Sequence, residues 1–110
     1  MPYIKNTSRE KFNESLKQIS DNILSIGDLN YCFSTIISNY LEDVKNIEKS
    51  VGYYHYNQLI GVLECAKLEL YRRLAAPYED IKIKENGDVY KLENKKSSSF
   101  NKLVHLIFKS

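Results

Sequence analysis

Five cationic or phenolic side chains lie close together in the segment "AKLELYRRLAAPYED", and these residue types suit an anionic, aromatic ligand. Lysine and arginine bind phosphate oxygens well, arginine through its planar fork of donors. A tyrosine ring offers a flat face for a nucleobase, and its hydroxyl can donate a hydrogen bond. The segment therefore predicts a site for a phosphate-bearing nucleotide, built from Lys67, Tyr71, Arg72, Arg73 and Tyr78.

Lys67 has two open interpretations. At about 100° per residue it projects from inside the apolar arc of a helix, with Glu64 and Tyr71 at spacings that let the side chains meet. In the simpler interpretation its stem lies along apolar surface and its ammonium, paired with Glu64, reaches water. In the other, it stands at the lip of the nucleotide pocket. Arg72 and Arg73 project about 100° apart, so a second subunit would supply one of them, which predicts a homo-oligomer.

The stretch "GYYHY" at residues 52–56 is unusually aromatic for the connection in which we place it. Tyr53, Tyr54 and Tyr56 either close the core where a helix begins or offer aromatic faces to a ligand. His55 would then be a donor whose charge changes near neutral pH. Both interpretations stay open.

Catalytic signatures are missing from the sequence. It has no G-x-S-x-G elbow, phosphate loop, H-E-x-x-H or Cys-x-x-Cys motif, so we expect no enzyme, no catalytic residue and no cofactor. Cys32 and Cys65 lie too far apart for a typical zinc site, and we expect both to be buried as small apolar residues. The formal charge of +2 gives no case for binding a nucleic acid polymer. Without a signal peptide or an apolar run long enough for a membrane span, we expect a cytoplasmic protein without a membrane partner.

Helical periodicity supplies the elements that position these residues. A first helix should begin with a cap at Thr7 or Ser8 and end at Gly27. Its apolar positions are Phe12, Leu16, Ile19 and Ile23. A second helix should cover about residues 28–46, with Asp28 as its cap.

The third helix is the longest predicted element. It should run from about Tyr54 or His55 to Ala75, bend or restart at Pro77, and stop at Gly87. Gly61, in a second strip of small residues, suggests close approach by another helix or a ligand. The predicted core arc of this helix comprises Tyr56, Leu59, Ile60, Leu63, Ala66, Leu70 and Leu74.

The chain should end in a polar spacer, "KKSSS", and a short amphipathic helix over about residues 100–108. The predicted fold is therefore all-α, a small helical bundle with a long central third helix kinked at Pro77 and a short C-terminal amphipathic helix. Residues 1–90 should form a single domain, and residues 91–110 the spacer and terminal helix.

Three stretches of the sequence resemble a family of small phage and bacterial proteins that has no established activity. They are "MPYIK" at the start, "GDLNY" at residues 27–31, and "IGVLECAKLELYRRLAAPYEDIKIKENGDVY" at residues 60–90. The resemblance covers most of the chain through Tyr90, and the tail from Lys91 lies beyond it. A phage setting would imply the cytoplasm of an infected bacterial host.

Small phage proteins of this size include sponges, such as the Sequestin and Lockin families, which trap nucleotide signals of host immunity. By analogy of size, setting and pocket chemistry, the leading hypothesis is a homo-oligomer that sequesters a cyclic nucleotide or ADP-ribose derivative without reacting with it. An alternative is an adaptor or inhibitor that binds a host protein through the Tyr-rich stretch and the terminal helix. The candidate ligand-binding residues are Asn30, Tyr31, Glu64, Lys67, Tyr71, Arg72, Arg73 and Tyr78.

Overall fold

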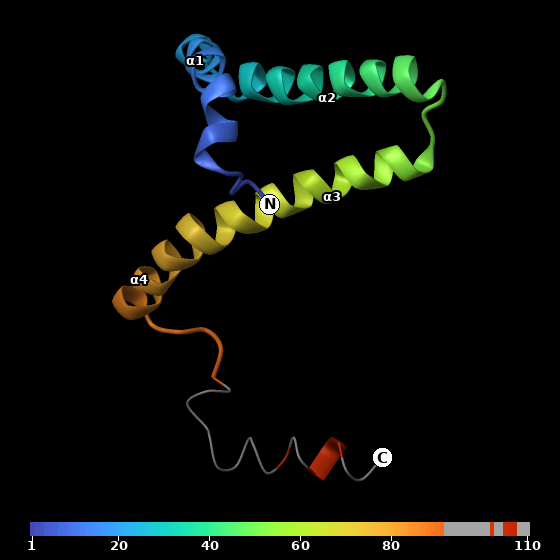
Figure 1. Cartoon of the computed structure of the whole chain (residues 1–110). Helices are drawn as coiled ribbons and strands as arrows, with labels where there is room; N and C mark the ends of the chain where they lie inside the picture. Colours follow the sequence, from blue (N-terminus) through green and yellow to red (C-terminus); the bar gives the residue numbers. More distant parts are fainter. Residues whose placement is uncertain (92–101, 103–104, 108–110) are drawn as a thin grey trace. The chain divides into compact units, whose positions relative to one another are not determined.

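The protein is all-α in the computed structural model, which describes residues 1–91, 102 and 105–107 (Figure 1). The described residues include no β-strand, and none of their helices is both long and apolar enough to cross a membrane. Of the predicted terminal helix, residues 102 and 105–107 are helical, and the rest lies outside the described residues. The elements are α1 (Asn6–Asn22), α2 (Ile26–Glu48), α3 (Tyr53–Leu70), the π-helical turn η1 (Tyr71–Ala75) and α4 (Ala76–Asn86).

The chain divides into two compact units, Met1–Glu69 and Leu70–Ser110. The first contains α1, α2 and all of α3 except its last residue, and the second contains η1 and α4. The single domain predicted for residues 1–90 stays a prediction.

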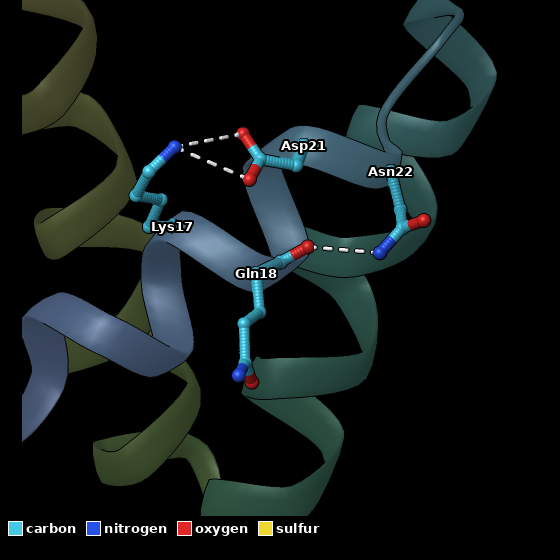
Figure 2. A network of polar contacts seen from close by, with 4 residues as sticks. All are labelled: Lys17, Gln18, Asp21 and Asn22. Carbon is cyan, nitrogen blue, oxygen red and sulfur yellow. Dashed lines mark hydrogen bonds and ion pairs between the residues drawn. The ribbon is translucent and has the colours of Figure 1, made fainter.

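Helix α1 begins without a side-chain cap. Lys5 occupies the cap position and makes no such hydrogen bond, so the cap predicted at Thr7 or Ser8 was wrong. At the other end, the side-chain amide of Asn22 donates to the Gln18 carbonyl at 2.9 Å, and Lys17 pairs with Asp21 at 3.2 Å (Figure 2). The Asn22 side chain thus folds back onto the last turn of α1.

Ser25, rather than Gly27, marks the boundary between the first two helices. Its hydroxyl oxygen accepts from the Asp28 amide at 3.0 Å, while the Asp28 carboxylate accepts from the Leu24 amide at 2.9 Å. This reciprocal arrangement satisfies two amides at the start of α2 and ends the preceding segment without a glycine. The predicted stop at Gly27 was therefore wrong, because Gly27 lies in the first turn of α2.

The capping contacts of Asp28 predict an acid-sensitive helix start. The Leu24 amide and then the Ser25 hydroxyl lower the pKa of the Asp28 carboxyl below its usual value of 3.8. A lowered folded pKa means that the contribution to stability is complete above the unfolded pKa and is lost as pH falls through the folded one. Melting temperatures from circular dichroism between pH 5 and pH 2 should therefore fall less for Asp28→Asn than for the natural sequence. Asp43→Asn, on the same helix, is the control and should retain the full acid sensitivity.

Helices α2 and α3 form an αα-hairpin whose tip is its best-packed part. Lys49 turns the chain with a left-handed backbone, φ 68°. His55 then accepts from the Gly52 amide through Nδ1 at 3.2 Å, and its Nε2 lies 2.6 Å from a Glu48 carboxylate oxygen. His55 thus closes the tip, and "YYHY" belongs to the start of α3 rather than to a loop. The half-buried residues here are Leu41, Val44, Val51, Gly52, His55 and Leu59.

Pro77 alters the helix ahead of it, as predicted. The Ala76 amide donates to the Tyr71 carbonyl, five residues back, which makes η1 one π-helical turn. Proline cannot donate to the carbonyl four residues earlier and its ring clashes with it, and a π-turn accommodates that defect while the backbone stays helical. Helix α4 then ends at Gly87, whose φ of 92° favours glycine, and this predicted stop is confirmed.

The apolar arc predicted as core in the third helix is left largely uncovered by the described part of the chain. No described side chain is buried, and Ile60 keeps 63% of its surface exposed. Cys32 is half-buried and Cys65 is exposed, so their predicted burial was wrong. The reason is that the described helices of the first unit make few close contacts along their lengths, so the periodic apolar faces remain without partners.

Candidate functional site

The π-helical turn carries three of the predicted ligand-binding residues, Tyr71, Arg72 and Arg73. The Tyr71 hydroxyl donates to the Glu79 carboxylate at 2.8 Å. Because that hydrogen bond and the negative charge of Glu79 favour the protonated phenol, the pKa of Tyr71 is raised above 10.0. At neutral pH Tyr71 is therefore a neutral donor held by a carboxylate.

Tyr78 lies one residue beyond Pro77, in the first turn of α4, and is exposed. The Lys82 ammonium lies 5.6 Å from the centre of the Tyr78 ring, within the range of a cation–π contact. Lys82 also pairs with Glu85 at 3.0 Å. The second unit thus combines an exposed aromatic ring with cations, the pair of groups that the nucleotide hypothesis needs.

A shallow hollow of about 350 Å³ lies at the end of α4. Glu79 and Lys82 contribute to its wall, and the turn after Gly87 forms the other side. The Tyr90 amide donates to the Asp88 carboxylate at 2.8 Å, which shapes that turn. Sequence reasoning missed Glu79 and Lys82 as neighbours of the candidate tyrosines Tyr71 and Tyr78.

Lys67 matches the simpler of its two interpretations. It pairs with Glu64 at 3.0 Å, and the two side chains are 69% and 52% exposed. Such a pair of exposed side chains contributes only about 0–1 kcal/mol to stability. Neither residue lines any of the three hollows described in this section.

Asn30 and Tyr31 lie near the start of α2, in the first unit. The Asn30 side-chain oxygen accepts from Ser34 at 3.2 Å. Tyr31 is exposed and, with Cys32 on the same helix, lines a hollow of about 410 Å³ against the end of α1. The sequence did not predict the other lining residues as a group, although capping types such as Asn22 and Asp28 mark the corner. They are Ile19, Asn22, Ile23 and Asp28.

A third hollow, of about 330 Å³, lies at the hairpin tip, where Tyr56 of α3 meets side chains of α2 such as Leu41 and Glu42. Among the described residues, no three His, Cys, Asp or Glu side chains lie close enough to hold a metal ion. The predicted ligand set is thus spread over separate local groups in the two units, and a joint site for all eight residues stays a prediction.

Comparison with known proteins places the chain in a family. No curated protein and no solved structure matches it. The model of one family, described as a domain of unknown function, matches residues 1–89. That coverage agrees with the sequence resemblance, which ended at Tyr90, and leaves out the polar spacer and the tail. The chain belongs to the DUF6899 family.

Proposed function

We propose that this chain is a binding protein without catalysis, whose helices complete their hydrophobic packing against another protein chain. The observation that supports this proposal is that the described part of the chain has no buried side chain, while large apolar residues are exposed along α1, α2 and α3. A folded domain of about 100 residues normally removes most of its large apolar side chains from water, since that burial drives folding. In this chain, burial of these apolar side chains would require contact with a partner.

The composition of the exposed faces suits a protein partner. Tyrosine is enriched where proteins bind one another, because it buries a large area at a low cost in side-chain entropy. Tyr53 and Tyr54 begin α3 with more than half of their surface exposed, and Phe33, Ile36 and Tyr40 follow one another on α2 at helical spacing. The host-protein adaptor considered from the sequence is one form of this function.

Incomplete packing has a direct test. At concentrations where the purified chain is a monomer, it should bind the dye ANS and show weak near-ultraviolet circular dichroism from its tyrosines. On addition of a true partner, or on self-assembly, dye should be released and the tyrosine signal should grow. A monomer that excludes the dye and unfolds in one sharp transition would contradict the proposal.

A second candidate function is sequestration of a phosphate-bearing nucleotide at the π-helical turn. The observation in its favour is that Tyr71, Arg72 and Arg73 share one π-turn, a feature often found at functional sites, with Tyr78 and Lys82 close by in the same unit. Phosphate oxygens would meet the cations and a base would meet the Tyr78 ring. A phage setting, and an immune signal as the ligand, would give this candidate its biological role.

Calorimetric titration with nucleotides tests the second candidate separately from the first. Titration with a panel of cyclic nucleotides and ADP-ribose derivatives should give saturable heat that Arg73→Ala weakens at least 10-fold. Lys84→Ala, which removes an equivalent charge from α4, should leave the affinity within about 2-fold. Absence of heat across the panel would remove this candidate and leave the protein-binding proposal intact.

A further inference from the structure

We propose that the partner of α3 is the α3 helix of a second copy of this protein. The two α3 helices pair antiparallel and are related by a two-fold axis. The inference rests on the proposed function and names its partner. The contact face, called here the α3 stripe, consists of Tyr53, Tyr56, Ile60, Leu63 and Lys67. In this arrangement Lys67 sets the direction in which the two helices pair.

The spacing of the α3 stripe is that of a coiled-coil seam. Its members are separated by three, four, three and four residues, so Tyr53, Ile60 and Lys67 take one core position of the heptad and Tyr56 and Leu63 the other. Side chains at that spacing form a single narrow line along a helix and insert between those of a facing helix. The seam is short, about 15 residues or roughly 22 Å of helix.

The α3 stripe is largely open, although one member, Tyr56, also lines the hollow against α2 at the hairpin tip, and the side of α3 next to the stripe serves the chain's own fold. Every member of the stripe is exposed. By contrast, Leu59 and His55 are half-buried at the hairpin tip, and Glu69 accepts from the Tyr3 hydroxyl at 2.5 Å. The intramolecular contacts of α3 therefore leave one seam available for a second helix.

A parallel pair of stripes is disfavoured by charge. Parallel helices place identical core positions opposite each other, so the Lys67 ammonium of one copy would face that of the other. Like charges in one layer repel, and withdrawing both from water adds to the cost. The Glu64 carboxylate, 3.0 Å from the ammonium of its own Lys67, lies at the edge of the seam and cannot separate the two ammonium groups.

An antiparallel pair removes that conflict and makes the stripe complementary to itself. Reversal brings the two kinds of core position opposite each other, so that Ile60 meets Leu63 of the second copy and Tyr56 meets its Lys67. The aliphatic residues form the centre, and at each end an ammonium lies against an aromatic ring, a favourable cation–π contact. A two-fold axis requires this reciprocity, since each residue contacts in the partner the residue that contacts it.

Disulfide trapping on the full-length chain shows whether two α3 helices pair parallel or antiparallel. All variants carry Cys32→Ser and Cys65→Ser, so that only the introduced thiols react. A chain with Tyr56→Cys is mixed with a mass-tagged chain with Lys67→Cys, and the mixture is oxidised. The mixed disulfide should be at least 10-fold more abundant than the symmetric one between two Tyr56→Cys chains, which keep both Lys67 ammonium groups. Antiparallel pairing separates the two copies of position 56 by about 11 residues, or 16 Å of helix.

The outcomes separate this inference from the proposed function. Rapid formation of a symmetric disulfide between two Tyr56→Cys chains would establish a parallel pair and overturn the inference. A chain that remains monomeric at 100 µM by sedimentation would overturn it as well. If such a monomer still binds ANS, the proposed function survives with a different partner, and if the monomer excludes the dye, both fail.

Discussion

Replacing Ile60 by aspartate should turn the self-associated protein into a monomer. Ile60 is 63% exposed in the single chain and lies at the centre of the proposed seam. Burial of an isoleucine side chain stabilises by about 1.5–3 kcal/mol, and a dimer contains two of them. The variant loses both and would have to bury two carboxylates, so the dissociation constant should rise by more than 100-fold, which corresponds to about 2.7 kcal/mol. Sedimentation equilibrium measures it directly.

Val62 provides the matched control for that experiment. It is 60% exposed, two residues along the same helix, and projects about 200° around the axis from Ile60. Val62→Asp introduces the same charge at a position of equal exposure outside the α3 stripe. It should change the dissociation constant by less than about 3-fold, since exposed positions outside a contact tolerate charge. Equal effects of the two substitutions would show that general loss of hydrophobicity, rather than the stripe, governs assembly.

The elements that the sequence predicted correctly depend on local physical chemistry. Helical periodicity is a property of one segment, and so are the stop at Gly87 and the disturbance ahead of Pro77. A left-handed glycine and a missing amide donor act within a turn or two, so neighbouring residues suffice to identify them. The boundary between the first two helices was predicted at Gly27 but lies at Ser25, which shows the limit of reasoning from single residue types. There a serine and an aspartate formed a reciprocal cap, which competes with any glycine nearby.

The predictions that depended on burial fared differently. An apolar arc indicates that one face of a helix is suited to burial, but not whether the same chain or another chain buries it. Residues assigned to a core, such as Ile60 and Leu63, are exposed in the structure because the described helices of the first unit make few close contacts along their lengths. The hollows at the α1–α2 corner and at the end of α4 were equally beyond sequence reasoning. Each depends on where two segments meet.

A leucine at position 67 should strengthen self-association and at the same time remove its directionality. In the proposed seam, Lys67 is the one charged group at a core position, and a single lysine there specifies orientation at a cost in stability. Lys67→Leu buries two additional aliphatic side chains per dimer and gives up two cation–π contacts of about 0.5–1 kcal/mol each. We expect the dissociation constant to fall at least 10-fold, which is about 1.4 kcal/mol.

Loss of direction is the more informative half of that result, because a general gain in hydrophobicity would not produce it. Without two Lys67 ammonium groups facing each other, parallel pairs no longer suffer charge repulsion. Chains that carry both Tyr56→Cys and Lys67→Leu should therefore form the symmetric disulfide between two copies of position 56. Chains that carry Tyr56→Cys alone should not. Lys17→Leu is the control. It also removes an exposed lysine from an ion pair, that with Asp21 on α1, and should leave both affinity and disulfide pattern unchanged. Tighter association with an unaltered disulfide pattern would mean that Lys67 only weakens the seam, and that some other contact sets its direction.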